Sequence, residues 1–169
     1  MKNQQSPIIG VMGPGNPDDE ALLKYAEELG KRIAQKNWNL LTGGRKAGVM
    51  DAASKGAFEA GGTVIGILPG DSKSDISDYV TIPVLTGMGN ARNVINILTA
   101  DIVVVCGMGP GTASEAALAM KCEKPLLFTM VDNKDVTFFN RLNHTIFSSI
   151  NHFDELIEQI EKFVQEVDS

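Results

Sequence analysis

The clearest chemical signal in the sequence is a glycine-rich run that ends in a hydroxyl group. Gly109, Gly111 and Thr112 follow a stretch of apolar residues and open a segment with helical periodicity. The first amide groups of a helix have no partner within it, and the helix dipole favours negative charge at that end. We therefore expect these three residues to bind an anionic group such as a phosphate, with the Thr112 hydroxyl as an additional donor.

Glu115 stands three residues after Thr112, and its role has two interpretations. Thr112-x-x-Glu115 is the capping-box pattern, in which the glutamate side chain bonds back to the amide at the start of the helix. A glutamate near the start of a phosphate-binding helix can instead face the sugar of the ligand. The sequence leaves both interpretations open.

Arg92 is a further candidate for contact with an anion. Asn90 has the residue type of a helix cap, which puts Arg92 in the first turn of the following helix. A cation there opposes the helix dipole, at a cost of about 0.3 to 1 kcal/mol. An anionic partner would remove that cost, and Glu115 and a ligand phosphate are the two candidates.

A second glycine-rich segment lies near the start of the chain and contains Gly13. Asp18 stands where the dinucleotide-binding fingerprint requires a glycine, so we expect no NAD site of that type. Asp18 or Asp19 has the residue type of a helix cap instead. Gly13 remains a candidate for contact with a phosphate-bearing ligand.

The third glycine-rich segment, Gly43-Gly44-Arg45-Lys46, combines paired glycines with two cations. Glycine permits a close approach of the backbone to a ligand, and the start of a helix attracts anions. We expect Gly43, Gly44 and Arg45 to close one side of the phosphate site; a tight turn with two solvated cations is the alternative. The Lys-Ser/Thr pair of a P-loop is missing after Gly48, which argues against ATP hydrolysis of that type.

The remaining reactive residue types give weaker signals. His144 and His152 are isolated, so we expect no metal site. Cys106 and Cys122 are too few for a disulfide framework, which indicates a reducing, cytoplasmic compartment. We interpret Cys106 as a small buried hydrophobic residue rather than a nucleophile.

Short apolar runs alternate with segments of helical periodicity, and this order predicts the elements that position these residues. The runs are typical of strands buried on both faces of a parallel sheet. We expect strands at 7–12, 39–41, 63–68, 80–84, 102–106 and 125–129. We expect helices at 18–36, 48–60, 92–100, 112–121 and 154–166.

Strand and helix in alternation predict an α/β fold: a single Rossmann-like, doubly wound, mostly parallel sheet with helices on both faces. A chain of 169 residues is the length of about one domain, so we assign residues 1–169 to a single Rossmann-like domain. Ligands of such sheets bind beyond the carboxyl ends of the strands, where the glycine-rich segments lie. The polar loop 70–79 is either a solvated turn or a flap over that site.

Composition excludes several classes of protein. Hydrophobic residues make up 43% of the chain and charged residues 21%, as is ordinary for a globular protein. The formal charge of −6 argues against general binding to nucleic acid or to an anionic membrane. No stretch approaches the roughly 18 apolar residues of a membrane span. From the charge and the missing span together, we expect neither nucleic acid nor membrane as a partner.

The motif Gly43-Gly44-x-x-x-Gly48-Val-Met50, together with Arg92 and the pattern Gly109-x-Gly111-Thr112-x-x-Glu115, resembles the Rossmann-like LOG family, often mislabelled lysine decarboxylase. The resemblance covers about residues 7–128. Enzymes of that family remove ribose 5′-phosphate from nucleoside 5′-monophosphates. The resemblance therefore implies that Arg92 and Glu115 act on the ribosyl group and the glycosidic bond, while the glycine loop holds the phosphate.

Two residues depart from the pattern of those enzymes, because Met108 replaces a glycine and Asn93 replaces a lysine. The run around Arg92 and Asn93 is similar to a sister branch that includes the molybdenum-cofactor carrier proteins, which bind a phosphorylated pterin without turning it over. The first hypothesis is thus a protein that binds a phosphate-bearing small molecule, either a nucleotide or a phosphorylated pterin such as the molybdenum cofactor. The alternative is a nucleoside 5′-monophosphate phosphoribohydrolase that releases free base and ribose 5-phosphate.

The resemblance also implies self-association, because members of the family form dimers or larger rings. The apolar side of the last predicted helix, 154–166, offers a surface for such contact. We therefore expect a homo-oligomer, a dimer or larger.

Overall fold

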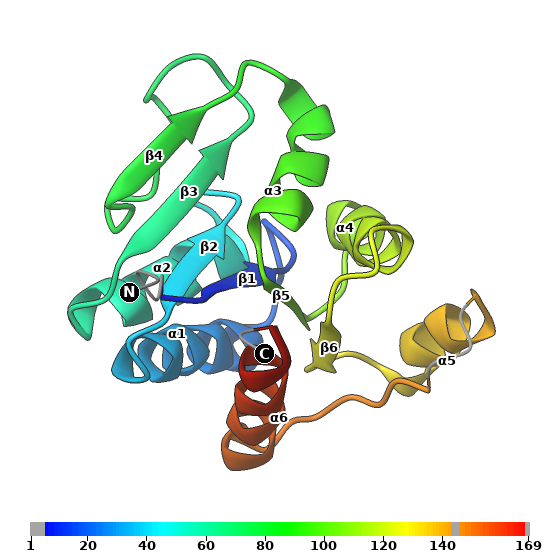
Figure 1. Cartoon of the computed structure of the whole chain (residues 1–169). Helices are drawn as coiled ribbons and strands as arrows, with labels where there is room; N and C mark the ends of the chain where they lie inside the picture. The colour runs from blue at the N-terminus through cyan, green and yellow to red at the C-terminus, as the bar shows by residue number, and fades with distance from the viewer. Residues whose placement is uncertain (1–5, 143–145, 168–169) are drawn as a thin grey trace.

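Six parallel strands form one sheet in the order β4-β3-β2-β1-β5-β6 (Figure 1). The structure is a computed structural model that describes residues 6–142 and 146–167. The strands are β1 (Ile8–Met12), β2 (Asn39–Thr42), β3 (Val64–Leu68), β4 (Ile82–Leu85), β5 (Ile102–Cys106) and β6 (Leu126–Thr129). The parallel, doubly wound Rossmann-like fold predicted from the sequence is confirmed.

Helices cover both faces of this sheet. They are α1 (Glu20–Gln35), α2 (Gly48–Glu59), the short 3-10 helix η1 (Gly89–Arg92), α3 (Asn93–Thr99), α4 (Pro110–Lys121), α5 (Asn133–Leu142) and α6 (Phe153–Val167). Helices α1, α2 and α6 lie on one face, and α3, α4 and α5 lie on the other (Figure 1). Each face therefore has its own layer of buried side chains.

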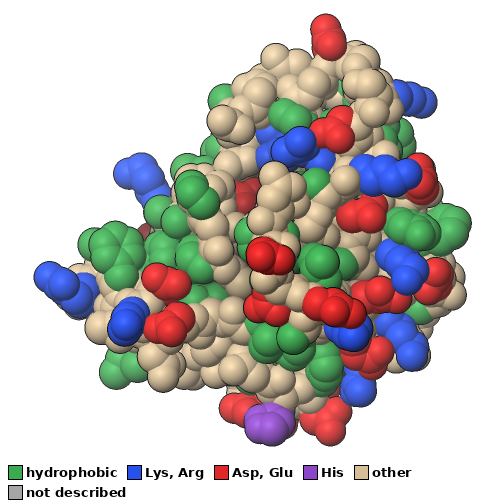
Figure 2. All heavy atoms as spheres, turned by 180° about the vertical axis from the view of Figure 1, so that it is seen from behind, with side chains coloured by type: hydrophobic (Ala, Val, Ile, Leu, Met, Phe, Trp, Pro, Cys, Tyr) green, Lys and Arg blue, Asp and Glu red, His purple; other side chains and the backbone are tan. Residues whose placement is uncertain are grey.

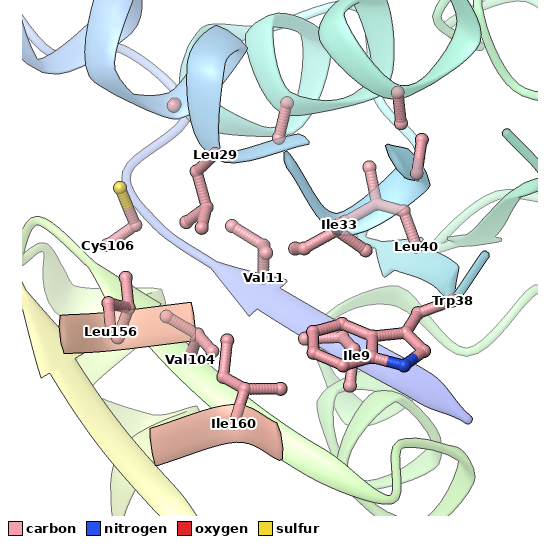
Figure 3. Packing of buried hydrophobic residues seen from close by; sticks show 14 of the residues in the cluster. Ile9, Val11, Leu29, Ile33, Trp38, Leu40, Val104, Cys106, Leu156 and Ile160 are labelled. Carbon is pink, nitrogen blue, oxygen red and sulfur yellow. The ribbon is translucent and has the colours of Figure 1, made fainter. Parts of the chain in front are cut away.

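The central strands are apolar because they are covered on both sides. All five residues of β5 are buried, and side chains of β1 and β5 alternate between the two layers. In one layer, Leu156 and Ile160 project from α6 toward Val104 of β5 (Figure 3). In the other, Phe128 of β6 stacks at a tilt against Phe139 of α5, with 5.4 Å between ring centroids.

The burial of α6 corrects one expectation about self-association. The apolar side of α6 packs into the core through Leu156, Ile157 and Ile160, so it is not a free surface. Exposed apolar side chains occur instead on the edge strand β4, at Ile82, Val84 and Leu85. On the face shown in Figure 2, basic side chains stand among acidic ones.

Element boundaries differ from the predicted ones at a few places. Strand β4 begins at Ile82 rather than at residue 80. Helix α5 and η1 were not predicted. Asp19 caps α1, because its carboxylate accepts a hydrogen bond from the amide of Leu22 at 3.0 Å. Among the described residues, no helix has the length and apolar character needed to cross a bilayer.

Candidate functional site

A cavity of about 360 Å³ opens at the carboxyl ends of β1, β2 and β5. The chain runs outward from β1 to β4 and then returns to place β5 on the other side of β1, so the strand order reverses at this point. Ligands of open α/β sheets bind at such a reversal. The loops after these three strands, together with the start of α3 and of α4, form the lining.

The start of α4 contributes the most distinctive group of the cavity. Gly109 is the cap residue and makes no side-chain hydrogen bond, and Pro110 follows as the first helical residue. The amides of Gly111 and Thr112 precede the first hydrogen bond of the helix, which joins the amide of Ala113 to the carbonyl oxygen of Gly109 at 2.8 Å. These amides and the positive end of the helix dipole therefore face the cavity.

Thr112 is 2% exposed, and its hydroxyl oxygen has no hydrogen-bond partner among the described residues. An unpaired hydroxyl buried in a protein costs about 1 to 3 kcal/mol. Since Thr112 lines the cavity, an anion seated there would accept this hydroxyl and remove that cost. The predicted residues Gly109, Gly111 and Thr112 therefore share one wall of the cavity.

Arg92 lies on the facing side and is held at both ends of its guanidinium group. Nη1 donates to Oδ1 of Asn93 at 2.5 Å, and Nη2 donates to the carbonyl oxygen of Gly43 at 3.3 Å. A third nitrogen of the group, Nε, is buried without a partner among the described residues. Burial lowers the pKa of Arg92, while the charge of Glu115 opposes that shift, and the group stays protonated.

Glu115 faces the cavity and does not cap α4. Its Oε1 accepts a hydrogen bond from the side-chain amide of Asn96 on α3 at 2.8 Å. The capping-box interpretation is wrong, because α4 begins at Pro110 and Thr112 lies inside the first turn. Burial raises the pKa of Glu115, and the Asn96 hydrogen bond and the charge of Arg92 partly offset that rise.

The predicted cap upstream of Arg92 is also wrong. Arg92 ends η1 and immediately precedes α3, and the cap position of η1 is Met88 rather than Asn90. Asn90 lines the cavity instead. Arg92 and Glu115 line the same cavity, and the charge of each affects the pKa of the other.

The cations after the second strand pair with the polar loop 70–79. Nε of Arg45 contacts Oδ2 of Asp75 at 2.5 Å, and Lys46 forms an ion pair with Asp78. The amide of Ser77 also donates to the carbonyl oxygen of Gly44 at 2.9 Å. The loop is thus fastened to the glycine segment, and Arg45 lines the cavity while remaining 43% exposed.

The other predicted glycines occupy different positions. Gly13 and Gly43 line the cavity. Gly44 does not line the cavity, and its amide donates a hydrogen bond to the hydroxyl oxygen of Thr42 at 3.1 Å. Met50, which ends the motif Gly43-Gly44-x-x-x-Gly48-Val-Met50, and Asn16, which was not singled out from the sequence, also line the cavity.

The other reactive residue types form no second site. Among the described residues, no three His, Cys, Asp or Glu side chains gather as metal ligands. His152 is exposed, and His144 lies outside the described residues. Burial raises the pKa of the Cys106 thiol to about 12, so this residue is a packing group and not a nucleophile at neutral pH.

Several solved structures share this fold at high sequence identity. The molybdenum cofactor binding protein of Rippkaea orientalis is 44% identical, with a TM-score of 0.91 over 95% of this chain and 99% of that one. The molybdenum cofactor carrier protein of Chlamydomonas reinhardtii is 48% identical, with a TM-score of 0.89 over the same shares. An uncharacterised protein of Archaeoglobus fulgidus is 44% identical over 114 residues, which are 67% of this chain and 73% of the relative.

A family model matches residues 6–157, which is most of the chain. The match extends from the residues before β1 to the second turn of α6 and includes every residue of the cavity. The resemblance to the LOG group of Rossmann-like proteins is therefore confirmed, and the chain belongs to the SLOG cluster4 family.

Proposed function

We propose that this protein binds the molybdenum cofactor, a phosphorylated pterin, in the cavity at the ends of β1, β2 and β5, and carries it without turning it over. The observation that supports this most directly is the buried, unpartnered hydroxyl of Thr112. It lies in a chain that is 44–48% identical to proteins described as binding or carrying that cofactor.

The cavity offers what a phosphate monoester requires. The amides of Gly111 and Thr112 and the Thr112 hydroxyl would donate to the phosphate oxygens, with Gly109 leaving room beside them. Nε of Arg92, which has no partner among the described residues, would supply a further donor. A volume of about 360 Å³ lies within the range of about 300 to 1,000 Å³ that small-molecule sites occupy.

Gly13, Gly43 and Arg45 also line the cavity and would contact the ligand. Arg45 would add an exposed positive charge. We assign Gly44 to the structure of the loop and not to ligand contact, because its amide already donates a hydrogen bond to Thr42. Cargo of this kind needs no resident metal in the protein, since the metal travels as part of the ligand.

The alternative function is hydrolysis of a nucleoside 5′-monophosphate, and the position of Glu115 is the observation in its favour. Glu115 and Arg92 line the same cavity as the phosphate wall. An oxocarbenium-like transition state is stabilised by a carboxylate close to the anomeric carbon, and Glu115 lines the cavity in which that carbon would lie. The carrier is the first choice because the chain is 44–48% identical to proteins described as binding or carrying the molybdenum cofactor.

The test combines loading with turnover. Purified protein is mixed with molybdenum cofactor released from a molybdoenzyme and separated from free cofactor, and bound molybdenum and pterin are then measured. The parent is expected to retain both, and Thr112→Asp is expected to lose both, because it places a carboxylate where the phosphate would sit. Equal retention by the two proteins would remove this site from consideration.

The same preparation is then incubated with a panel of nucleoside 5′-monophosphates that includes AMP. The carrier assignment predicts no release of free base. Release that disappears in Glu115→Gln would establish the phosphoribohydrolase instead.

We further propose that the protein is a homo-oligomer and that β4 contributes to its interface. Ile82, Val84 and Leu85 are 49%, 38% and 39% exposed on the edge strand, where open backbone groups favour pairing with another chain. Light scattering at micromolar concentration is expected to give a dimer or larger. A monomer under those conditions would contradict this assignment.

We also assign the whole chain, residues 1–169, to one domain that acts in the cytoplasm. The family match over residues 6–157 supports a single unit. The two free cysteines, Cys106 and Cys122, support a reducing compartment.

A further inference from the structure

We propose that Asn93 is the positioning residue of the anion site: it holds the Arg92 guanidinium in place and links it to the first turn of α4. This inference rests on the proposed anion site and concerns how that site is kept in shape. Asn93 lines the cavity and begins α3, directly after Arg92.

The first link joins Asn93 to Arg92. Oδ1 of Asn93 accepts from Nη1 of Arg92 at 2.5 Å, while the carbonyl oxygen of Gly43 accepts from Nη2 at 3.3 Å. The guanidinium is planar and rigid, so bonds at both terminal nitrogens determine where Nε points. Nε is the donor that remains buried without a partner among the described residues.

The second link joins Asn93 to α4. Nδ2 of Asn93 donates to the hydroxyl of Ser114 at 2.9 Å, and that hydroxyl donates to the carbonyl oxygen of Gly111 at 2.6 Å. A continuous chain of side-chain hydrogen bonds therefore crosses from the loop after β2 to the start of α4. It connects the two facing walls of the cavity.

The residue type at position 93 is specific to this task. A side-chain amide supplies an acceptor and a donor at once, whereas a carboxylate only accepts and an ammonium group only donates. The hydrogen bonds on Arg92 also come from neutral oxygens, those of Asn93 and Gly43. The charge of Glu115 raises the pKa of Arg92, but no ion pair joins Arg92 to a carboxylate among the described residues.

Arg92 therefore keeps its positive charge available while it loses its freedom to move. Arg45 differs in this respect, since its Nε is paired with Asp75. A guanidinium that is already oriented loses less conformational freedom when it binds an anion. Removing the Asn93 amide should thus weaken binding through Arg92, without Asn93 itself contacting the ligand.

A double-mutant cycle with inorganic phosphate as the probe tests this inference by calorimetric titration. Asn93→Ala is expected to weaken phosphate binding about tenfold, as for loss of a hydrogen bond to a charged group. In an Arg92→Met background the same change is expected to have less than a twofold effect, because the residue through which Asn93 acts is gone. Equal effects in the two backgrounds, or no effect in either, would overturn the inference.

A second variant separates positioning from a role in folding. Asn93→Asp keeps an acceptor for Nη1 and suits the start of a helix, but it neutralises Arg92 and loses the donor to Ser114. It should fold and should bind phosphate at least as weakly as Asn93→Ala. Phosphate binding equal to that of the parent would contradict the inference.

Thr137→Ala on α5 is the matched control, because it removes one exposed side-chain hydrogen bond outside the cavity. Its phosphate affinity should equal that of the parent. Failure of the parent itself to bind phosphate would overturn the proposed function and this inference together. If the parent binds phosphate but Asn93→Ala has the same effect with and without Arg92, only this inference would be overturned.

Discussion

Nη2 of Arg92 and the carbonyl oxygen of Gly43 are joined by a hydrogen bond of 3.3 Å, and a methyl group on Gly43 would come within 2.8 Å of the same nitrogen. The close approach of a buried cation therefore leaves no room for a side chain at position 43 unless Arg92 moves. The contact joins two loops that are 49 residues apart in the chain. It makes the position of Arg92 dependent on the backbone that follows β2.

Gly43→Ala should displace Arg92 while leaving the fold nearly intact. The added methyl group would meet only the far ends of two side chains, Met50 and Arg92, which can move. We expect phosphate affinity to fall about tenfold, as for the loss of a hydrogen bond to a charged group, and the free energy of unfolding to change by about 1 kcal/mol or less. Titration and chemical denaturation measure the two quantities. A loss of stability with unchanged affinity would show that Gly43 serves packing alone.

Arg45 and Arg92 should differ in their dependence on salt. Arg45 is 43% exposed and already paired with Asp75, so its attraction for an anion is screened by salt. We expect Arg45→Ala to weaken phosphate binding by about two- to threefold at low ionic strength and to have almost no effect near 0.5 M salt.

Arg92→Met is the comparison, because Arg92 is only 7% exposed and its interactions are screened much less. Its effect on phosphate affinity should persist at both salt concentrations. An Arg45→Ala effect that survives high salt would mean that Arg45 contacts the ligand in a desolvated position.

Glu115→Gln should change how stability depends on pH. Burial raises the folded-state pKa of Glu115 above its ordinary value, so the folded protein holds this proton more strongly than the unfolded chain does. The contribution of Glu115 to the free energy of unfolding is therefore complete at low pH, and it is lost as pH rises through the folded-state pKa. The unfolding free energy of the parent relative to Glu115→Gln should therefore fall as pH rises above about 4, the ordinary pKa of a glutamate.

Glu20→Gln is the control for that experiment, since the Glu20 side chain is 82% exposed at the start of α1. Chemical denaturation at several pH values measures all three proteins. A relative stability of Glu115→Gln that does not change with pH would show that the Glu115 carboxyl is not desolvated in the folded state.

The sheet, and the meeting of Gly109, Gly111 and Thr112 at one cavity, could be predicted from the sequence because local signals determine them. Buried parallel strands are short apolar runs, and the glycines before Thr112 mark the loop where such a sheet binds ligands. Helix α5 was not predicted, although its apolar residues Val136, Phe139 and Leu142 stand three residues apart and indicate a helix.

The errors around Thr112 and Arg92 have a different cause. Pro110 suits the first position of a helix, since it has no amide hydrogen to leave unpaired, and this signal in the sequence places Thr112 inside the first turn. The pairing of Glu115 with Asn96 could not be predicted, because it joins side chains of α4 and α3 that only the packing of these helices brings together. Local pattern thus indicated residues that meet at one cavity, and tertiary packing determines the contacts that their side chains make.

The hydroxyl of Thr112 is the group on which the account depends most. Thr112→Val keeps the branched shape and removes only this unpartnered hydroxyl, so the free energy of unfolding should stay within about 0.5 kcal/mol or rise. The decisive measurement is the affinity of parent and Thr112→Val for the molybdenum cofactor, determined from bound molybdenum per chain at increasing cofactor concentrations. We expect the variant to bind about tenfold more weakly at equal stability. Equal affinity, or a loss of more than about 2 kcal/mol in stability, would contradict the account, because the hydroxyl would then serve the protein and not the cargo.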